Sequence, residues 1–508
     1  MAMAEGLAGL QTISDVRAAA DVAPTALVGA ARALLDTGFR LALVAAHDDG
    51  DALRVVYLFT AGPPDRRVEL RVRLDHQHPI VDSLARLSFP AGRFEREMRD
   101  LFGVEPAGHP RPARLVLHQH WPEGWHPMRR DAGPAPPMGD ENQPFPFLEV
   151  QGPGVYEIPV GPVHAGLIEP GHFRFSVVGE TILNMKARLW FVHKGIERLF
   201  QGRDPASGVE LAERISGDTA VGHNLAYCLA VEDAYHCEVP RQAQLARAVL
   251  LELERLYNHV ADVGALCNDV GFGVINAHAL RLRERLLRLN ADITGHRLLR
   301  GAIVPGATSL RRLPGVDELA ALTADFHEVV DVALANSTVV DRFTGTAMLS
   351  RDHAAEIGTL GYVARASGLG LDARLAHPFV ELPGDLTIPV AGAGDVLARF
   401  QVRVREFDES VALIGRLLDQ LEPGPPQASA ALEARQFRDS GVGITEAWRG
   451  TIVHRVELDP DGRLQRVKIV DPSFMNWPAL PVALADTIVP DFPLANKSFN
   501  LSYAGNDL

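Results

Sequence analysis

Hydrophobic and polar residues alternate in the first part of the chain as β-strands require. From Arg67 to Leu74, charged and apolar residues alternate with a period of two, which predicts a strand with one solvated face. The segments 39–46 and 53–59 are more uniformly apolar and predict two neighbouring, more buried strands. A helix is expected next, because apolar residues between Phe94 and Leu101 recur at intervals of four and three residues.

The hydrophobic period becomes helical in the longer second part. One apolar stripe runs from Leu245 to Val260, and another runs from Val396 to Leu421 and ends at the proline-rich run 422–426. Long amphipathic helices of this kind predict a bundle-like core. A late β-hairpin is expected where the strands 452–458 and 464–470 flank a turn that contains proline and glycine.

A proline-rich segment separates the two parts. Residues 131–147 contain five prolines and two glycines, which prevent a helix and leave few donors for a sheet. We therefore predict three regions: an α+β domain over residues 1–131, a linker over 132–150, and a mainly α-helical, bundle-cored domain with small β-hairpins over 151–508.

Composition limits the classes of function. The chain has 508 residues, of which 47% are hydrophobic and 22% charged, so disordered and fibrous classes are excluded. Its formal charge of −14 repels phosphate backbones and argues against a nucleic-acid partner. Three cysteines are too few for a disulfide framework, which favours a reducing compartment.

The sequence shows neither a signal peptide nor a membrane span. Glu5 and Asp15 interrupt the apolar core that a signal peptide needs. No stretch approaches the roughly 18 uncharged apolar residues that span a bilayer. We expect a soluble protein that reaches a membrane only through a partner.

Three motifs between residues 80 and 131 follow one another in a distinctive order. They are Glu95–Gly103, Gly108–Pro110 and Trp121–Asp131. This order resembles the C-type subunit of respiratory complex I, which energy-converting hydrogenases of the formate hydrogenlyase type carry fused to their large subunit. The resemblance implies a segment that packs on neighbouring subunits and performs no chemistry. The alternative is an ordinary solvated helix face.

Further motifs resemble the large subunits of hydrogenases and their relative, the D-type subunit of complex I, from about residue 155 to the last residue. In the family's order they are Gly161–Phe175, Phe191–Glu197, Asn224–Glu232, Gly295–Gly301, Ala364–Gly368, Glu446–Gly450, Asp471–Pro478 and Asn496–Phe499.

The metal ligands of those hydrogenases are missing. The resemblance implies two thiolates in the segment Arg214–His223 and two near the C-terminus, because nickel and low-spin iron take soft sulfur ligands. Ser216 and Thr219 stand at the first two positions, and Ser502 and Gly505 at the last two. We therefore expect no nickel site.

The existing cysteines do not replace these ligands. No C-x-x-C motif occurs among Cys228, Cys237 and Cys267. We interpret them as small thiols buried in the core. An iron–sulfur cluster usually needs four ligands, so this protein alone is not expected to hold one.

The D-type subunit of complex I also lacks the four thiolates and helps to form a cavity for the quinone head. In that family a histidine and a tyrosine contact the quinone. His164 stands at the histidine's place in this sequence, but Gly217 stands at the tyrosine's place. Only one of the two side chains that contact the quinone in that family is therefore present, so a quinone site is possible but does not carry over whole.

A polar, ionisable set remains where the metals of the relatives bind. Near an apolar interior, such groups could relay protons or bind a polar head group; a satisfied hydrogen-bond network left by metal loss is an equally weighted alternative. We expect Arg214 to pair with an acid, because a buried unpaired guanidinium is costly. The candidates are His164, Glu169, His172, Arg214, Asp218, His223 and Asp507.

The resemblance implies a fused, C-plus-D-type, peripheral-arm subunit of a membrane-bound oxidoreductase complex, on the cytoplasmic face. Its role would be electron transfer coupled to proton or ion movement. The protein would hold no cofactor itself and would dock a B-like iron–sulfur subunit, an H-like membrane subunit and antiporter-like subunits. No dinucleotide fingerprint occurs, so any NADH would bind another subunit. The rivals are a hydrogen-evolving large subunit, which the absent thiolates oppose, and a non-catalytic scaffold.

Overall fold

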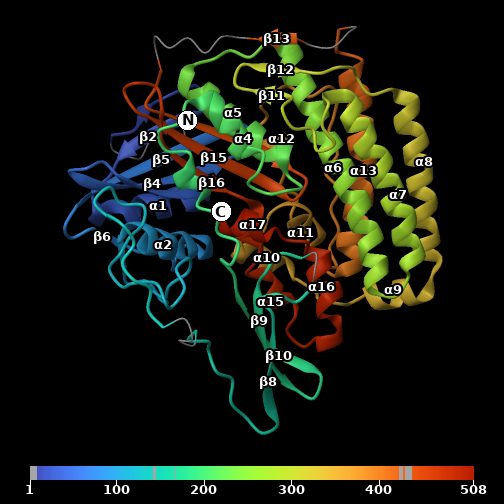
Figure 1. Cartoon of the computed structure of the whole chain (residues 1–508), viewed down its shortest axis with the longest axis horizontal. Helices are drawn as coiled ribbons and strands as arrows, with labels where there is room; N and C mark the ends of the chain where they lie inside the picture. The colour runs from blue at the N-terminus through green and yellow to red at the C-terminus, as the bar shows by residue number, and fades with distance from the viewer. Residues whose placement is uncertain (1–8, 141–144, 166–167, 423–426, 430–436) are drawn as a thin grey trace. The chain divides into compact units, whose positions relative to one another are not determined.

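The computed structural model describes residues 9–140, 145–165, 168–422, 427–429 and 437–508. It divides into two compact units, Met1–Glu149 and Val150–Asn506, with Asp507 grouped with the first and Leu508 with the second. Helices and several small sheets make up the chain (Figure 1), so the predicted mixture of α and β structure is confirmed.

A five-stranded sheet forms the centre of the first unit, in the order β1-β2-β5-β4-β3. Strand β5 pairs in parallel with β2 and antiparallel with β4. Along β5, Val68, Leu70 and Val72 are buried, as the alternating sequence predicts, and Arg73 is exposed. The expected solvated face is only partly solvated, because Glu69 on that face is buried in an ion pair with Arg17. The strands are β1 (Gln11–Thr12), β2 (Arg17–Asp21), β3 (Arg40–Asp48), β4 (Ala52–Ala61) and β5 (Arg66–Asp75).

Two helices and a small parallel pair of strands complete this unit. They are α1 (Leu27–Asp36), α2 (Phe89–Phe102), β6 (Ile80–Asp82) and β7 (Glu105–Ala107).

Two acidic side chains of the motif in α2 accept hydrogen bonds from backbone amides. Glu95 accepts a 2.6 Å hydrogen bond from the amide of Leu84, and buried Asp100 accepts three from the amides of 115–117. This motif therefore has a structural role within the unit.

A bundle of long helices forms one side of the second unit, at the right in Figure 1. Helix α6 (Arg241–Asp269) packs against α7 (Gly273–Thr294) and α13 (Val396–Leu418), and α8 (Val316–Ala335) packs on α7. The predicted stripes lie in α6 and α13. Most of the proline-rich run that is expected to end the latter, residues 423–426, lies outside the described residues.

Shorter helices connect the bundle to the rest of this unit. They are α3 (Ile196–Leu199), α4 (Val209–Ala212), α5 (Ala220–Tyr235), α9 (Ser337–Phe343), α10 (Arg351–Ile357), α11 (Gly361–Ala366), α12 (Ala373–Ala376), α14 (Pro472–Asn476), α15 (Ala479–Ala483), α16 (Phe492–Phe499) and α17 (Tyr503–Asp507).

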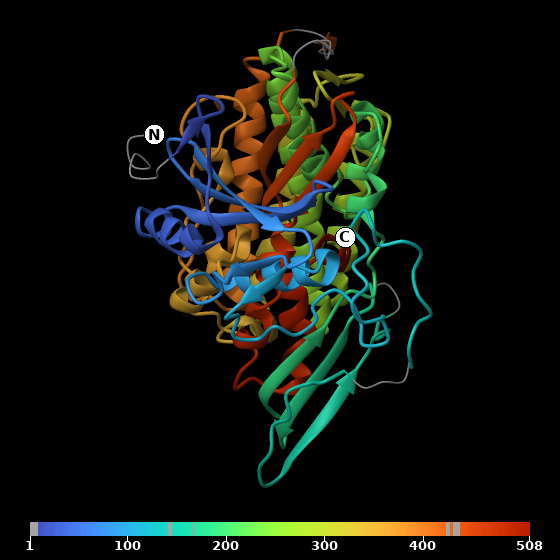
Figure 2. The same ribbon diagram turned by 90° about the vertical axis from the view of Figure 1, so that its left-hand side faces the viewer.

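Three small antiparallel sheets belong to the second unit. They are β8 (Val155–Val160), β9 (His172–Val178) and β10 (Thr181–Arg188); β11 (Ile303–Val304), β12 (Ala307–Ser309) and β13 (Gln427–Ser429); and β14 (Ser440–Ala447), β15 (Gly450–Leu458) and β16 (Leu464–Val470). Figure 2 shows the first sheet extending away from the helices of its unit. The last contains the predicted hairpin as β15 and β16.

The proline-rich segment has little regular structure where it is described. Residues 131–140 and 145–147 form turns and irregular structure, while 141–144 lie outside the described residues. None of the described helices combines the length and the apolar character needed to cross a bilayer.

Candidate functional site

Two of the positions at which the resemblance implies thiolates in hydrogenases meet in the structure. Ser216 lies just before α5, and Ser502 caps the first turn of α17. Their hydroxyl oxygens are 2.8 Å apart and share a buried hydrogen bond, although 286 residues separate them in the sequence. The Ser502 oxygen also accepts from the amide of Gly505. The two segments therefore converge, as the resemblance implies, and hydroxyls form the contact between them.

An ion pair lies next to these hydroxyls. Arg449, in the turn between β14 and β15, donates to both carboxylate oxygens of Asp218 at 2.5 and 2.7 Å. The hydroxyls of Ser216 and Thr219 donate to one oxygen of the same carboxylate. The Arg449 side chain is 4% exposed and that of Asp218 37%, so the pair is open to solvent only on its acidic side.

This pairing fixes the charge of the acid. Burial alone would raise the pKa of Asp218, but the Arg449 guanidinium and the hydroxyl donors lower it to about 2. Asp218 is therefore ionised at neutral pH. A bidentate guanidinium–carboxylate pair is among the stronger and more directional polar contacts in proteins.

The backbone at Asp218 is also held in place. Its carbonyl oxygen accepts hydrogen bonds from Tyr257, Asn258 and Trp448, at 2.9 to 3.2 Å. Buried Glu254 accepts from the amides of 221 and 222, at the start of α5. Burial raises the pKa of Glu254 to about 8, and the nearby charge of Asp218 adds to this effect.

A second series of polar groups leads away from the same segment. His223 lies in the first turn of α5, and its Nε2 is 2.9 Å from a carboxylate oxygen of Asp471. Its Nδ1 is 3.1 Å from Nε2 of His454 on β15. Burial and the neighbouring His223 lower the pKa of His454 well below its usual range. Three buried ionisable groups therefore form a continuous hydrogen-bonded series.

The loop before β9 brings two further candidates to α17. His164 Nε2 lies 3.5 Å from the hydroxyl of Tyr503, and the carboxylate of Glu169 accepts a 3.0 Å hydrogen bond from the amide of Ala504. Burial lowers the pKa of His164. Since Tyr503 follows Ser502 directly, these two side chains approach the end of the segment that carries the paired hydroxyls.

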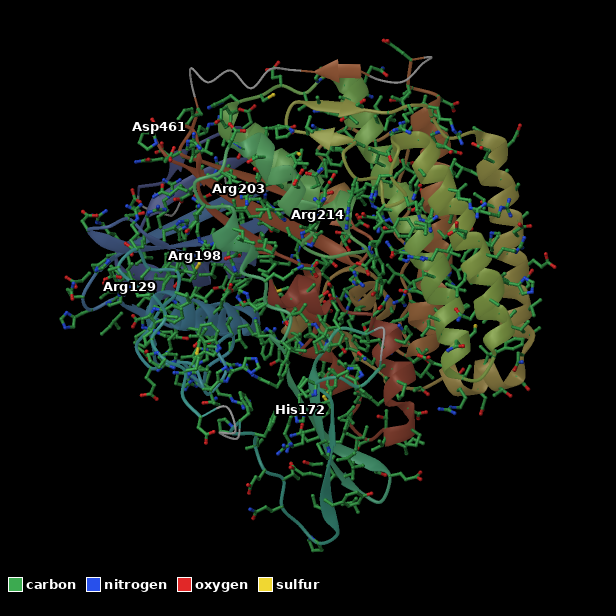
Figure 3. All side chains as sticks on the ribbon, viewed as in Figure 1. Arg129, His172, Arg198, Arg203, Arg214 and Asp461 are labelled. Carbon is green, nitrogen blue, oxygen red and sulfur yellow. The ribbon has the colours of Figure 1, made fainter. Side chains whose placement is uncertain are left out.

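Two predicted candidates, His172 and Arg214, lie apart from this cluster. His172 lies on β9 with its Nδ1 3.2 Å from the carbonyl oxygen of Gly161, and Figure 3 shows it far from Arg214. Arg214 is exposed and donates to the carbonyl oxygen of Glu210. The expected pairing of Arg214 with an acid is therefore wrong, because solvent hydrates its guanidinium. Asp507 is buried at the end of α17, the short helix that Ser502 caps.

A surface pocket of about 620 Å³ lies beside the loop that precedes Ser216. Lys194, Arg198 and Arg203 contribute cationic side chains to its lining, and the last two are labelled in Figure 3. The Lys194 ammonium donates to the carbonyl oxygens of residues 214 and 215. Among the described residues, none of the seven predicted candidates lines this pocket.

Three family models match different parts of the chain. Residues 20–137 match the respiratory-chain NADH dehydrogenase 30 Kd subunit, residues 269–440 match the 49 Kd subunit, and residues 194–267 match nickel-dependent hydrogenases. Formate hydrogenlyase subunit 5 of Escherichia coli is 32% identical over 455 residues, which cover 87% of this chain and 79% of that protein. The chain belongs to the formate hydrogenlyase subunit 5 family.

Other members of this wider group confirm the predicted resemblance. The fused C/D subunit of NADH-quinone oxidoreductase from Bacteroides fragilis is 28% identical, over 79% of this chain and 82% of that protein. The structure of an archaeal membrane-bound sulfane sulfur reductase, a respiratory membrane complex, matches 70% of this chain and 99% of its own, with a TM-score of 0.64 and 26% identity. The relatives are subunits of hydrogenases and of complex I-like respiratory enzymes.

The residues present do not fit the nickel centre of nickel-dependent members of this group. Hydroxyls at three positions and a glycine at the fourth offer none of the soft thiolate donors that nickel takes there. A Cβ at Gly505 would lie 2.5 Å from the carboxyl carbon of Asp471, so a cysteine at this position would displace that group. The Asp218–Arg449 pair instead supplies the charged groups beside the paired hydroxyls.

The three cysteines do not compensate. Cys228 and Cys267 are buried in the core, and Cys237 is partly buried. Burial raises the pKa of all three thiols, to about 12 for Cys267. A cysteine binds a metal ion as its thiolate, so the raised pKa of these thiols disfavours metal binding.

The site contains residues that the sequence interpretation did not select. Trp448 and Arg449 lie in the motif 446–450, and Asp471 opens the motif 471–478, so the resemblance marked these segments. Glu254 and His454 lie outside the quoted motifs and became visible only through their hydrogen-bond partners.

Proposed function

We propose that this protein is the large subunit of the peripheral arm of a membrane-bound respiratory complex, and that it works there without nickel. The observation that carries this proposal is the contact between Ser216 and Ser502 beside the Asp218–Arg449 ion pair. Hydroxyls and an internal ion pair can position protons and water, but they lack the ligands for hydrogen activation at nickel.

The polar cluster would serve proton transfer beside an electron-transfer partner. His223, His454 and Asp471 form one hydrogen-bonded series, and such imidazole and carboxylate series can pass protons. His164 and Glu169 would provide the approach from the loop before β9. This arrangement supports movement of protons in step with electrons that another subunit carries.

The membership of the family supports a more detailed assembly. The first unit would act as the C-like docking domain, and the second as the D-like domain. A B-like iron–sulfur subunit, an H-like membrane subunit and antiporter-like subunits would hold the protein at the cytoplasmic face of the membrane. An iron–sulfur cluster in the B-like partner would deliver electrons, and a quinone head would fit beside His164.

Two other functions give different results in the assembled complex. A hydrogen-evolving large subunit requires nickel, which the donor set opposes. A non-catalytic scaffold would tolerate loss of His164, provided that the complex still assembles. Turnover of variants in the purified complex therefore separates the quinone-binding role from the scaffold.

The test compares two histidine variants in the purified, intact complex. His164→Ala is expected to lower electron transfer to a short-chain quinone about tenfold, as expected for the loss of a hydrogen bond to a substrate. His172→Ala, on the neighbouring strand but outside the cluster, serves as the matched control and should retain activity. The set of assembled subunits, measured by mass spectrometry, should be unchanged in both.

A further variant is expected to strengthen quinone binding rather than weaken it. A Cβ at Gly217 meets no atom within 4 Å, so Gly217→Tyr would place a hydroxyl near the loop without a backbone clash. We expect it to lower the KM for the quinone. Full activity of His164→Ala together with an unchanged KM in Gly217→Tyr would contradict a quinone site and favour the scaffold.

A further inference from the structure

A buried ionic network lies between the helix bundle and the strand β14. Arg365 on α11 contacts Glu406, Asp372 and Glu446 at 2.6, 3.1 and 2.8 Å. Arg374 contacts Asp372 and Glu252 at 2.7 and 3.1 Å. Arg255 contacts Glu252 at 3.0 Å and Glu406 at 3.9 Å. None of these side chains is more than 5% exposed.

The charges within this network do not balance. Among the described residues it contains three guanidiniums and four carboxylates, which are Arg255, Arg365, Arg374, Glu252, Asp372, Glu406 and Glu446. With every group ionised, one negative charge would remain in the interior without a counter-ion. An uncompensated buried charge is very costly, so binding of one proton is favoured.

The charged groups around the network do not supply the missing positive charge. Arg403 pairs with Asp262 at 2.9 Å. Arg399, on the same helix α13, donates to a hydroxyl and two carbonyl oxygens, and the charge of Asp395 acts on it as the nearby acid. The Asp218–Arg449 pair is neutral as a unit. Buried Glu254 lies near Arg255 on α6, but its pKa is raised to about 8, so it is protonated and carries no charge at neutral pH. These neighbours therefore add no net charge, and the deficit stays within the network.

Histidine 259 is the other titratable group in contact with the network. Its Nε2 lies 2.8 Å from Glu406, and within the described part of the chain its Nδ1 has no hydrogen-bond partner. Burial lowers the pKa of His259; the hydrogen bond and charge of Glu406 act against this, and the charges of Arg255 and Arg403 act with it. A protonated ring would also bury an Nδ1–H group without an acceptor among the described residues. His259 is therefore neutral, and the proton belongs on a carboxylate.

Among the four carboxylates of the network, Glu446 contacts the fewest guanidiniums. Its carboxylate contacts one guanidinium, that of Arg365, which also serves Glu406 and Asp372. Each of the other three carboxylates contacts two guanidiniums. One Glu446 oxygen lies 2.7 Å from the hydroxyl of Thr451, which can rotate from donor to acceptor when the carboxyl is protonated. The amide of Ala373 also donates to this oxygen at 3.0 Å. Burial and the charge of Asp372 raise the pKa of Glu446 and outweigh Arg365 and Thr451, which lower it.

We propose that this network is a proton-binding site of the protein, which holds one exchangeable proton on the Glu446 carboxyl near neutral pH. Glu446 lies three residues before Arg449, and Arg255 donates to the carbonyl oxygens of both Glu446 and Ala447 at the end of β14, directly before the turn that carries Arg449. A change of charge at the Asp218–Arg449 pair would therefore change how tightly Glu446 binds this proton. The inference deepens the proposed proton-coupled role and rests on it only for the use of the proton in the complex.

The first test measures bound protons through the stability of the full-length protein. A native carboxyl that keeps a proton released by the unfolded chain makes folding less favourable as pH rises. One such proton changes the unfolding equilibrium constant tenfold per pH unit. Between about pH 6 and pH 7, Glu446→Gln should remove this tenfold dependence relative to wild type. Urea unfolding at each pH provides the equilibrium constant.

A second variant distinguishes the network from a single perturbed carboxyl. Glu252→Gln leaves Glu446 in place but removes another negative charge, so the network balances and Glu446 should release its proton. Glu252→Gln should therefore lose the same tenfold dependence. Glu284→Gln is the matched control, because Glu284 also binds arginines but lies at the surface of α7. It should behave as wild type in this pH range.

Infrared spectroscopy of the same native proteins gives an independent reading, should a variant unfold too readily for denaturation experiments. Buried Glu254, whose pKa is about 8, contributes its own carbonyl band in all of these proteins. One further carbonyl band of a protonated carboxyl should be present in wild type and Glu284→Gln, and lost in Glu446→Gln and Glu252→Gln. An unchanged band and slope in Glu446→Gln would overturn the proposal. Loss of the band and the slope in Glu446→Gln but not in Glu252→Gln would also overturn it, because the proton on Glu446 would then not depend on the charges of the network. These measurements use the isolated protein, so failure of the quinone assay leaves them unaffected.

Discussion

At the scale of single residues, one ion pair distinguishes this site from a thiolate metal centre. Arg449 is buried and its guanidinium is matched to the two oxygens of Asp218. Asp218 stands between the two degenerate positions Ser216 and Thr219, and both hydroxyls donate to it. The residues at the cysteine positions of the relatives thus take part in solvating this carboxylate.

Removal of the acid should leave a buried cation without its partner. Asp218→Asn is expected to lower the free energy of unfolding by about 2–4 kcal/mol, a value reduced from that of a fully buried pair because Asp218 is partly exposed. Urea denaturation at pH 7 measures this loss. The double variant Asp218→Leu with Arg449→Met should recover most of it, since apolar pairs can replace buried ion pairs. Additive losses in the double variant would contradict a direct coupling.

The same pair predicts a pH dependence with a defined sign. Because the pKa of Asp218 is lowered to about 2, the stability that its charge contributes is present above its unfolded pKa of about 4. It is lost as pH falls toward 2. The difference in unfolding free energy between wild type and Asp218→Asn should therefore shrink below about pH 4. A difference that stays constant down to pH 2 would rule out ionised Asp218 as its cause.

At the scale of secondary structure, the close packing of α5 on β14 positions the site. Gly441 and Gly443 on β14 face the backbone of α5, and a Cβ on Gly443 would lie 1.9 Å from the carbonyl oxygen of Ala226. Helix α5 begins directly after Thr219, and β14 leads into the turn that carries Arg449. The absence of side chains at these glycines therefore brings Asp218 and Arg449 within reach of each other.

Gly443→Ala tests this packing. The added methyl group must push α5 and β14 apart, so the variant should lose about 2–3 kcal/mol of unfolding free energy. Gly415→Ala in α13 is the matched control, because its Cβ meets nothing within 4 Å. That change should stabilise the protein by about 0.5–1 kcal/mol, as alanine favours helix. Equal effects of the two variants on thermal unfolding would argue against the close approach.

The elements with a regular hydrophobic period were predictable from the sequence, and the site was predictable only in part. Alternation identified β5, and the apolar stripes identified α6 and α13, because each pattern reflects one buried face. The pairing of Asp218 with Arg449 joins positions 231 residues apart. No local pattern encodes such a contact. The predicted pairing of Arg214 is wrong for a related reason, since a sequence does not reveal which side of a short loop faces solvent.

At the scale of the whole molecule, the protein combines two compact units that match two different subunit families of respiratory complexes. Its relatives include hydrogenases, an NADH-quinone oxidoreductase subunit and a component of a sulfane sulfur reductase complex. The same architecture therefore occurs in complexes with different reactions. The proposed function assigns proton transfer, and not nickel chemistry, to the polar groups that stand at the thiolate positions in this protein.

The content of nickel in the purified complex tests this account most directly. The complex would be purified from cells grown with ample nickel and analysed by elemental mass spectrometry, with a nickel-dependent hydrogenase treated in parallel as the positive control. We predict nickel far below one atom per protein molecule, together with no hydrogen oxidation or evolution above background. One tightly bound nickel atom per molecule, with hydrogen activity that follows it, would contradict the account.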